Sequence, residues 1–308
     1  MQTNSSLLRF DVHAHFGIDD DTRVAGNQHV SDLGDDAVWS PEKALGFMDA
    51  RGIGLQLLSL PMAMDPGLAR AVNERGARIV AARPDRFGLL AALPMAAPER
   101  AVEELRHAGD DLGADGFVLL SNYDGAYLGD PRFDPVLAEL DRRGASVLLH
   151  PTTPPAYDRL GLGRPGPLLE FPVDTARTVV DALYAGVFLR YPNLRLVLAH
   201  AGGALPGLFH RILALGGKPW VANPSGVTPQ QLREQAAALY FETAIAAGAL
   251  APVLELAGPD HLLFGTDFPP AGTDVIDDAI AALTRDTALT RLDATFRTLF
   301  PRAAARAA

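Results

Sequence analysis

A pair of histidines near the start of the sequence has a spacing that suits metal binding. His13 and His15 lie in the stretch 10–16, Phe-Asp-Val-His-Ala-His-Phe, whose apolar and aromatic residues predict a strand. Side chains alternate along a strand, so Asp11, His13 and His15 share one face and Phe16 lies on the other. Two imidazoles about 7 Å apart on one face can converge on a single ion. A two-histidine motif alone is weak evidence, so the rest of the sequence has to support it.

Three later predicted strands also end in residues that bind metals or move protons. His150 ends the fifth predicted strand, His200 the sixth and Asp267 the eighth. The carboxyl ends of parallel strands form the active-site rim of a barrel, so we expect these three side chains to lie beside His13 and His15. Three histidines and an aspartate suit a borderline divalent cation, with Zn²⁺ favoured and Mn²⁺, Fe²⁺ and Co²⁺ as alternatives. His200 is better placed as a general acid or base than as a ligand.

The elements that must position these residues alternate between strand and helix. The predicted strands cover residues 10–16, 53–60, 87–94, 116–120, 145–150, 194–200, 239–243 and 261–267. The predicted helices cover 41–52, 66–83, 98–108, 133–143, 174–191, 205–215, 229–238, 250–257, 274–284 and 288–299, followed by a frayed tail. This order predicts an α/β fold, a (β/α)8 TIM barrel with extra C-terminal helices, as one domain over 1–308. No Gly-x-Gly-x-x-Gly follows the first strand, which disfavours an open doubly wound sheet.

Composition narrows the classes of function. The 308 residues include 37 acidic and 27 basic side chains, a formal charge of −10, which argues against nucleic-acid and anionic-membrane partners. The sequence contains no cysteine, so any metal must sit on histidines and carboxylates. The N-terminal residues lack the basic and long apolar regions of a signal peptide, which favours a cytoplasmic location.

The candidate site residues lie in four motifs: Asp11-Val-His-Ala-His15, Leu149-His-Pro151, His200-Ala-Gly-Gly203 and Leu263-Phe-Gly-Thr-Asp-Phe-Pro269. Together these motifs resemble the amidohydrolase superfamily, and within it the decarboxylase branch of the aminocarboxymuconate-semialdehyde, γ-resorcylate and 6-methylsalicylate decarboxylases. Three further segments, Leu119–Tyr123, Tyr127–Asp130 and Phe171–Arg177, most resemble the 6-methylsalicylate type. The resemblance extends from Asp11 to about Pro269.

The resemblance implies roles for individual residues. His13, His15, His150 and Asp267 would ligate one metal ion, His200 would handle protons, and no organic cofactor would be needed. Arg211 would reach across the interface of a homodimer to the carboxylate of a small-molecule substrate. The fourth predicted strand, 116–120, carries no lysine, which disfavours the lysine-bridged two-metal centre of related hydrolases. His13 also differs from the glutamate that the resorcylate-type enzymes carry at this place.

The favoured function is therefore metal-dependent, non-oxidative decarboxylation of a small hydroxyaromatic or unsaturated acid, with a 6-methylsalicylate-like substrate. Either Asp267 or His200 with a water would supply the proton. Hydrolysis of an amide, ester or lactone is the alternative, and a barrel that binds without catalysis is a third. We expect aromatic contacts to substrate from Phe16, Tyr123 and Phe171, with Tyr157 and Trp220 as further candidates. The loop 152–172 is predicted either to close over the site or to be a plain surface loop.

Overall fold

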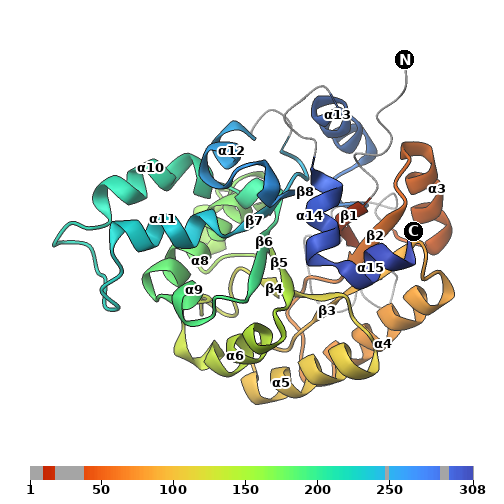
Figure 1. The fold of residues 1–308 in the computed structure, drawn as a ribbon, viewed down its shortest axis with the longest axis horizontal. Coiled ribbons are helices and arrows are strands. Elements are labelled where there is room, and N and C mark those ends of the chain that lie inside the picture. The colour runs from red at the N-terminus through yellow and green to blue at the C-terminus, as the bar shows by residue number, and fades with distance from the viewer. Residues whose placement is uncertain (1–9, 18–37, 247–249, 285–290, 308) are drawn as a thin grey trace.

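The computed structural model describes residues 10–17, 38–246, 250–284 and 291–307. It contains one eight-stranded parallel sheet whose strands follow one another in chain order. The strands are β1 Phe10–His15, β2 Leu55–Ser59, β3 Phe87–Ala92, β4 Gly116–Leu120, β5 Ser146–His150, β6 Arg195–Leu198, β7 Tyr240–Glu242 and β8 Leu262–Leu263. They occupy the centre of the molecule, with the helices around them (Figure 1).

The sheet closes on itself between β8 and β1. The N–H of Val12 donates to the carbonyl of Phe264 at 2.9 Å, and the N–H of His15 donates to the carbonyl of Phe268 at 2.8 Å. The N–H of Asp267 donates to the carbonyl of His13 at 2.7 Å, within the same seam. These bonds leave no open sheet edge between the first and last strands, and the predicted (β/α)8 barrel is confirmed.

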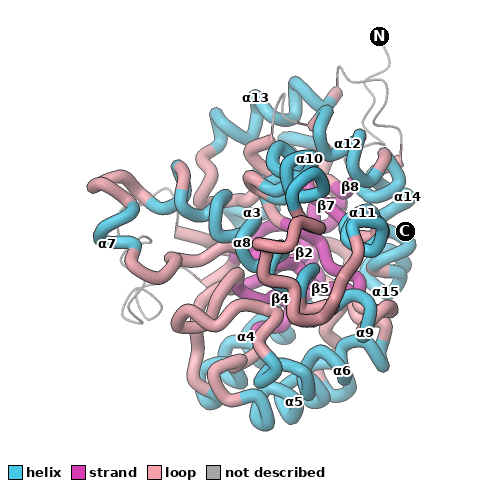
Figure 2. Tube along the Cα trace, turned by 90° about the vertical axis from the view of Figure 1, so that its left-hand side faces the viewer, coloured by secondary structure: helices cyan, strands magenta, loops and turns pink. Residues whose placement is uncertain are grey.

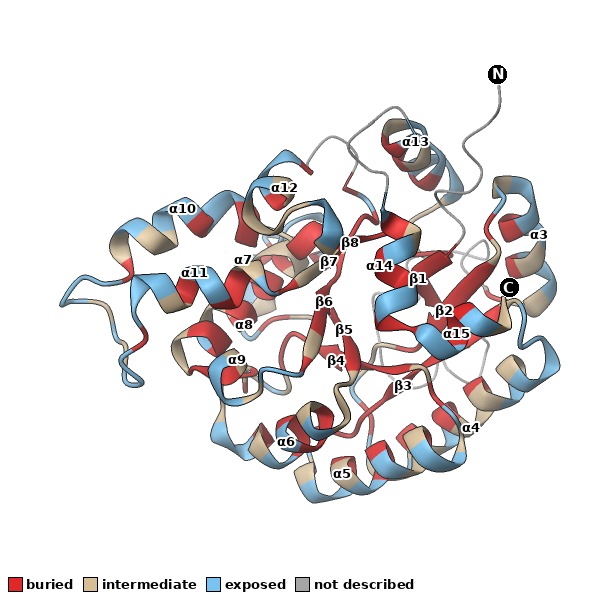
Figure 3. Cartoon of the chain, viewed as in Figure 1, coloured by how far each residue is buried: buried red, intermediate tan, exposed pale blue. Residues whose placement is uncertain are grey.

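Helices follow the strands in the predicted order. They are α3 Pro41–Arg51, α4 Pro66–Ala82, α5 Pro98–Arg106, α6 Asp134–Arg143, α7 Tyr157–Leu160, α8 Glu170–Tyr184, α9 Val187–Arg190, α10 Leu205–Leu215, α11 Pro229–Ala237, α12 Ala251–Ala257, α13 Thr273–Leu283, α14 Leu292–Leu299 and α15 Pro301–Arg306. Apart from α7, which has no buried residue, the helices carry buried residues on one side and exposed residues on the other (Figure 3). No described helix has both the length and the apolar character that a membrane crossing requires.

Local signals explain where α3 begins and ends. The Ser40 hydroxyl accepts from the N–H of Lys43, and Pro41 occupies the first turn, where a missing N–H costs nothing. Gly52 ends the helix in the left-handed conformation, with φ of +71°, which glycine adopts without steric cost. The predicted boundaries of this helix agree with the structure to within one residue.

The helix predicted at 174–191 and the eighth predicted strand differ from the structure. The predicted helix 174–191 begins earlier, at Glu170, and is divided at Gly186, whose φ is +68°, into α8 and α9. The eighth strand is shorter than predicted, because its pairing with β7 ends at Leu263, although hydrogen bonds to β1 continue as far as Phe268. The predicted loop 17–40 lies mostly outside the described residues.

The predicted frayed tail is wrong. Residues 301–306 form α15, with Pro301 in its first turn and with Ala303 and Ala304 buried. Arg306 donates two hydrogen bonds to the buried carboxylate of Asp115, at 3.0 and 2.8 Å. The alanine-rich composition suggested a solvated end, but packing against the barrel and this ion pair hold the helix in place.

Candidate metal centre

Four side chains converge at the carboxyl ends of the strands. His13 and His15 come from the end of β1, His150 ends β5, and Asp267 follows β8. One ligand atom from each lies within 4.8 Å of the others. The Nε2 atom of His15 is 3.1 Å from Nε2 of His13 and 2.9 Å from Oδ1 of Asp267. The sequence prediction that these four residues meet at one rim therefore agrees with the geometry.

The outer nitrogen of each histidine ring has its own partner. The Nδ1 atom of His13 lies 3.0 Å from Oε1 of Glu242, and that of His15 lies 3.2 Å from Oγ of Ser59. The Nδ1 atom of His150 lies 2.7 Å from the carbonyl of Pro151. A histidine that donates through Nδ1 presents the lone pair of Nε2, which is the arrangement found around bound metals.

The donor set fits a divalent cation. Two neutral Nε2 atoms facing each other at 3.1 Å repel unless a proton or a cation lies between them. Two ligands of a tetrahedral ion, each ~2.0–2.1 Å from it, stand about 3.3 Å apart. Three imidazoles and one carboxylate also match the ligand types that zinc and similar ions prefer. His13, His15, His150 and Asp267 are therefore suited to hold such an ion.

Burial and charge favour the ligand forms of most of these groups. Burial lowers the pKa of His15 and, more strongly, that of His150, which favours the neutral form of both rings. Burial opposes the charge of Asp267, but nearby imidazoles, led by that of His13, outweigh it and hold its pKa well below the usual range. Burial also lowers the pKa of His13, yet the charges of Glu242 and Asp267 prevail and raise it to about 9. A cation bound at His13 must displace that proton.

The buried carboxylate of Asp11 connects β1 to β2 and to the segment after β8. Asp11 accepts from the N–H of His13 at 3.0 Å and from the N–H and hydroxyl of Thr266 at 3.0 and 2.6 Å. The amide of Gln56 donates to it at 2.9 Å. Asp11 thus connects β1, β2 and the segment after β8 directly beneath the ligands. Burial raises its pKa to about 6, against the lowering effect of these hydrogen bonds.

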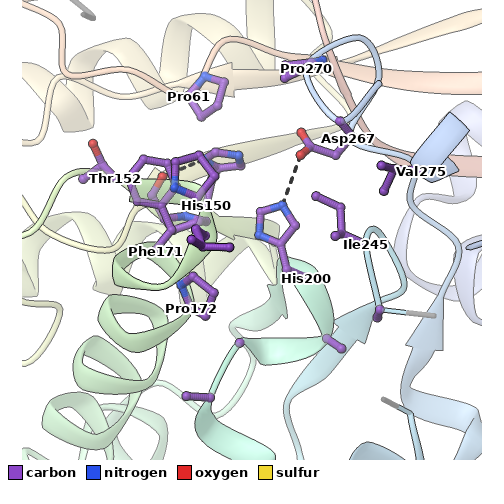
Figure 4. A pocket seen from close by; sticks show the side chains of 18 of the residues that line it. Pro61, His150, Thr152, Phe171, Pro172, His200, Ile245, Asp267, Pro270 and Val275 are labelled. Carbon is purple, nitrogen blue, oxygen red and sulfur yellow. Dashed lines mark hydrogen bonds and ion pairs between the residues drawn. The ribbon is translucent and has the colours of Figure 1, made fainter. Parts of the chain in front are cut away.

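His200 lies next to the four candidate ligands, at the end of β6. Its Nε2 atom is 3.3 Å from Oδ2 of Asp267, and its ring points at that carboxylate (Figure 4). His200 and Ala201 both have left-handed backbones, with φ of +53° and +52°. This turn aims the imidazole into the cavity described below. His200 can therefore exchange a proton with a bound molecule while Asp267 orients its ring.

A cavity of about 800 Å³ opens above these residues. His15, His150, His200 and Asp267 supply its polar floor. Its walls are mainly apolar and include Leu60, Met62, Leu168, Phe171, Pro206, Ile245 and Val275. Among the residues that the structure describes, no lysine or arginine lines it. Such a cavity suits an aromatic ring whose one charged group meets the polar floor.

The predicted aromatic contacts are only partly correct. Phe171 lines the cavity, but Phe16 and Tyr123 do not. Phe16 lies on the strand face opposite the histidines, with its ring 6.4 Å from that of Trp39. The Tyr123 hydroxyl accepts from the N–H of Leu120 at 2.9 Å, and its ring packs against Phe133. Both rings are structural. Tyr157 and Trp220 are likewise outside the lining, and Trp220 is 71% exposed.

The loop 152–172 contributes to the cavity wall. Thr152, Pro167, Leu168 and Phe171 from this segment line the cavity, whereas α7 and its flanking loops project from the side of the barrel (Figure 2). Whether the loop closes over a bound molecule stays a prediction.

Asp174, on α8, connects the segment that contributes to this cavity wall with the segment that follows β4. Its buried carboxylate accepts from Ser121 Oγ at 2.6 Å, Asn122 Nδ2 at 2.8 Å and the Tyr127 hydroxyl at 2.9 Å. Arg177 on the next turn of α8 also donates to it, at 2.6 Å. The three segments that most resemble the 6-methylsalicylate type are therefore joined at one carboxylate.

Glu242 is the residue that the sequence analysis missed. It ends β7, is completely buried and contacts both His13 and the backbone of His200. The rule that polar residues at strand ends gather at one rim would have found it, because it is the next-to-last residue of the predicted strand 239–243. His13, His200 and Glu242 form a second group of neighbouring donors.

Arg211 lies on α10, exposed and outside the cavity lining. Pro206 and Gly207 at the start of the same helix do line the cavity. The arginine is therefore not brought to the site of its own chain, which agrees with the predicted need for a second chain and does not test it.

A parallel (β/α)8 barrel with a histidine-rich, metal-suited rim defines the class of metal-dependent TIM-barrel enzymes. The amidohydrolase family model matches residues 10–306, and the chain belongs to that family. Its relatives include the 6-methylsalicylic acid decarboxylase of Penicillium expansum, 38% identical over 214 residues, which are 68% of this chain and 65% of that protein. Decarboxylase macB of Penicillium terrestre is 33% identical over 303 residues, which cover 90% and 88% of the two chains.

Solved structures agree with this assignment. A crystal structure of 2,6-dihydroxybenzoate decarboxylase in complex with 2,6-dihydroxybenzoate superposes with a TM-score of 0.80 at 26% identity. The match covers 95% of this chain and 99% of that one. The resemblance to the decarboxylase branch is confirmed: all three proteins are named as decarboxylases, and two of the names specify a hydroxybenzoic acid, 6-methylsalicylic acid and 2,6-dihydroxybenzoate.

Proposed function

We propose that this protein is a metal-dependent, non-oxidative decarboxylase of a small hydroxybenzoate of the 6-methylsalicylate kind. The observation that carries the proposal is the convergence of His13, His15, His150 and Asp267, with His200 beside them, on the floor of an apolar cavity. The names of the relatives support the same reaction class. The cytoplasm stays the proposed compartment, which a chain without cysteines suits.

Each group at the floor has a distinct task. A divalent ion held by His13, His15, His150 and Asp267 would supply positive charge for the substrate carboxylate and its ortho hydroxyl. The apolar walls, Phe171 among them, hold the ring and exclude water. Zn²⁺ is the proposed ion because three of the four ligands are imidazoles.

Proton transfer is assigned to His200. Both oxygens of Asp267 are engaged, Oδ1 with His15 at 2.9 Å and Oδ2 with His200 at 3.3 Å. His200 therefore delivers the proton and Asp267 orients it. The proton forms a C–H bond at the ring carbon that bears the carboxylate, and aromaticity is lost. The bond to the carboxylate carbon then breaks, its electron pair restores the aromatic ring, and CO₂ leaves.

One experiment tests the reaction class. The purified protein is analysed for metal, stripped with a chelator and reloaded with Zn²⁺ or Mn²⁺. Each form is assayed for CO₂ release from 6-methylsalicylate, 2,6-dihydroxybenzoate and salicylate. We expect about one ion per chain, CO₂ from at least one acid, loss of activity on stripping and recovery on reloading. Metal without CO₂ would move the proposal to hydrolysis of an amide, ester or lactone, and absence of metal after reloading would end it.

We also propose that Arg211 binds the substrate carboxylate from the second chain of a homodimer. Neither a lysine nor an arginine belongs to the described lining of the cavity, so no such side chain of the same chain pairs with the substrate carboxylate. Helix α10 lines the cavity at Pro206 and carries Arg211 on its exposed side.

Replacing Arg211 by alanine is therefore expected to raise KM for a hydroxybenzoate by about 10-fold or more, because a charge-assisted hydrogen bond is worth ~1.5–3 kcal/mol. Bound metal should be unchanged. Arg78→Ala, which removes an exposed arginine of α4, is the matched control and should behave as wild type. An unchanged KM for Arg211→Ala, or a monomer in sedimentation, would contradict the role.

A further inference from the structure

Glu242 occupies an unusual place for a carboxylate. It is completely buried at the end of β7, and each of its oxygens is used. Oε1 lies 3.0 Å from Nδ1 of His13 and also accepts the backbone N–H of His200. Oε2 accepts the N–H of Ala244 at 2.6 Å. One carboxylate thus contacts a candidate ligand and the residue assigned to proton transfer.

The segment after β8 leaves room for this carboxylate because residue 265 is a glycine. A Cβ atom added to Gly265 would lie 2.0 Å from Oε2 of Glu242 and 3.0 Å from Cβ of His13. Gly265 does not have a positive φ, so its requirement for glycine comes from space and not from backbone conformation. Any larger residue at 265 must displace Glu242 from its partners.

We infer that Glu242 is a positioning residue that couples the metal centre to the proton-transfer histidine. The inference rests on the proposed function and adds a residue to it. Because Glu242 can only accept, it keeps the proton of His13 on Nδ1 and leaves Nε2 to face the other ligands. Through the N–H of His200 it also fixes the left-handed turn that aims that ring into the cavity.

Replacement of Glu242 by glutamine would disturb these hydrogen bonds, because an amide cannot accept from all three partners. An amide has one oxygen and one NH₂ group, whereas the three partners of Glu242 all act as donors. With its oxygen towards His13, glutamine sets its NH₂ against the N–H of Ala244. In the flipped orientation its NH₂ faces His13, whose proton must then move to Nε2, the nitrogen needed for metal binding. Either orientation disturbs the site without changing its volume.

The experiment compares wild type with Glu242→Gln and Gly265→Ala, and uses Gly46→Ala as the matched control. A Cβ atom at Gly46, on α3, meets nothing within 4 Å. Metal affinity is measured with Zn²⁺ by chelator competition, and kcat and KM are measured at saturating Zn²⁺. Circular dichroism of the metal-free proteins shows whether each variant folds.

We expect Glu242→Gln to weaken Zn²⁺ binding by about 10–100-fold, the range for partners of metal-ligating histidines. At saturating Zn²⁺ we expect a lower kcat with little change in KM. Gly265→Ala should act in the same direction, and Gly46→Ala should match wild type. Full kcat in Glu242→Gln at saturating Zn²⁺ would overturn the coupling to His200.

Unchanged Zn²⁺ affinity in a folded Glu242→Gln would overturn the role at His13. If Gly265→Ala fails to fold, Glu242→Gln carries the test alone. The affinity measurement does not depend on the substrate, so it stands even if none of the hydroxybenzoates releases CO₂. Failure of the proposed reaction and failure of this inference are therefore distinguishable.

Discussion

Replacing His15 by alanine is expected to remove the bound cation and, with it, CO₂ release. The Nε2 atom of His15 lies 3.1 Å from Nε2 of His13 and 2.9 Å from Oδ1 of Asp267, so its loss removes one of the four clustered ligand atoms. Loss of an outer partner already costs about 10–100-fold in metal affinity, and loss of a ligand should cost more. Metal analysis and equilibrium dialysis against Zn²⁺ measure the effect.

Thermal unfolding gives a second measure of the same variant. An ion that binds only the folded protein stabilises it by about 2.7 kcal/mol at a free concentration 100 times its Kd. Added Zn²⁺ should therefore raise the melting temperature of wild type and leave that of His15→Ala nearly unchanged. His210→Ala is the control, because His210 is an exposed histidine on α10 that pairs with Glu255 away from the cavity. Wild-type metal content in His15→Ala would mean that His15 is not a ligand.

The second large effect is a loss of activity, expected when His200 is replaced by asparagine. Asparagine in its place is too short to reach Asp267 and cannot act as an acid near neutral pH. General acid–base catalysis typically contributes ~10²–10⁴-fold, so kcat should fall by about that factor. Metal content should stay at the wild-type value, since His200 is not one of the four clustered ligands.

The melting temperature should show that His200→Asn loses activity because the imidazole is missing and not because the protein is unfolded. Asparagine tolerates the left-handed backbone that His200 adopts at φ of +53°, and it retains the N–H that donates to Glu242. The melting temperature of His200→Asn should therefore equal or exceed that of wild type. Loss of metal in the variant would make His200 a ligand, and retained kcat would return the proton transfer to Asp267.

Much of the site could be predicted because the fold class fixes where the end of each strand lies. The strands of a closed parallel sheet all end at one rim, so His13, His150 and Asp267 could be grouped without knowledge of any contact. The alternation of side chains along a strand also placed Phe16 on the face away from the histidines, and the structure agrees with that face. The predicted contact of Phe16 with substrate does not follow from this alternation, and Phe16 is not among the residues that line the cavity.

The position of Tyr123, the burial of α15 and the role of Glu242 could not be predicted, because they depend on tertiary contacts that the spacing of residues in the sequence does not show. Tyr123 folds back because its hydroxyl meets the N–H of Leu120, and nothing in the pattern of the turn shows this. The burial of Ala303 results from the fit of α15 against the barrel, which an alanine-rich segment does not reveal. The partners of Glu242 come from β1 and the end of β6, so its role appears only when the three chain segments are brought together.

The seam between β1 and β8 has a consequence for biosynthesis. His15 and Asp267 are 252 residues apart in the chain, yet their side chains meet at 2.9 Å. A ribosome that has made seven strands has supplied every histidine of the ligand set but not the carboxylate that completes it. With the proposed ligand set, high-affinity metal loading would have to follow synthesis of residue 267, and a nascent protein stalled before that residue should exchange its ion freely with cellular chelators. Acquisition of metal would then report that the last strand has closed the barrel.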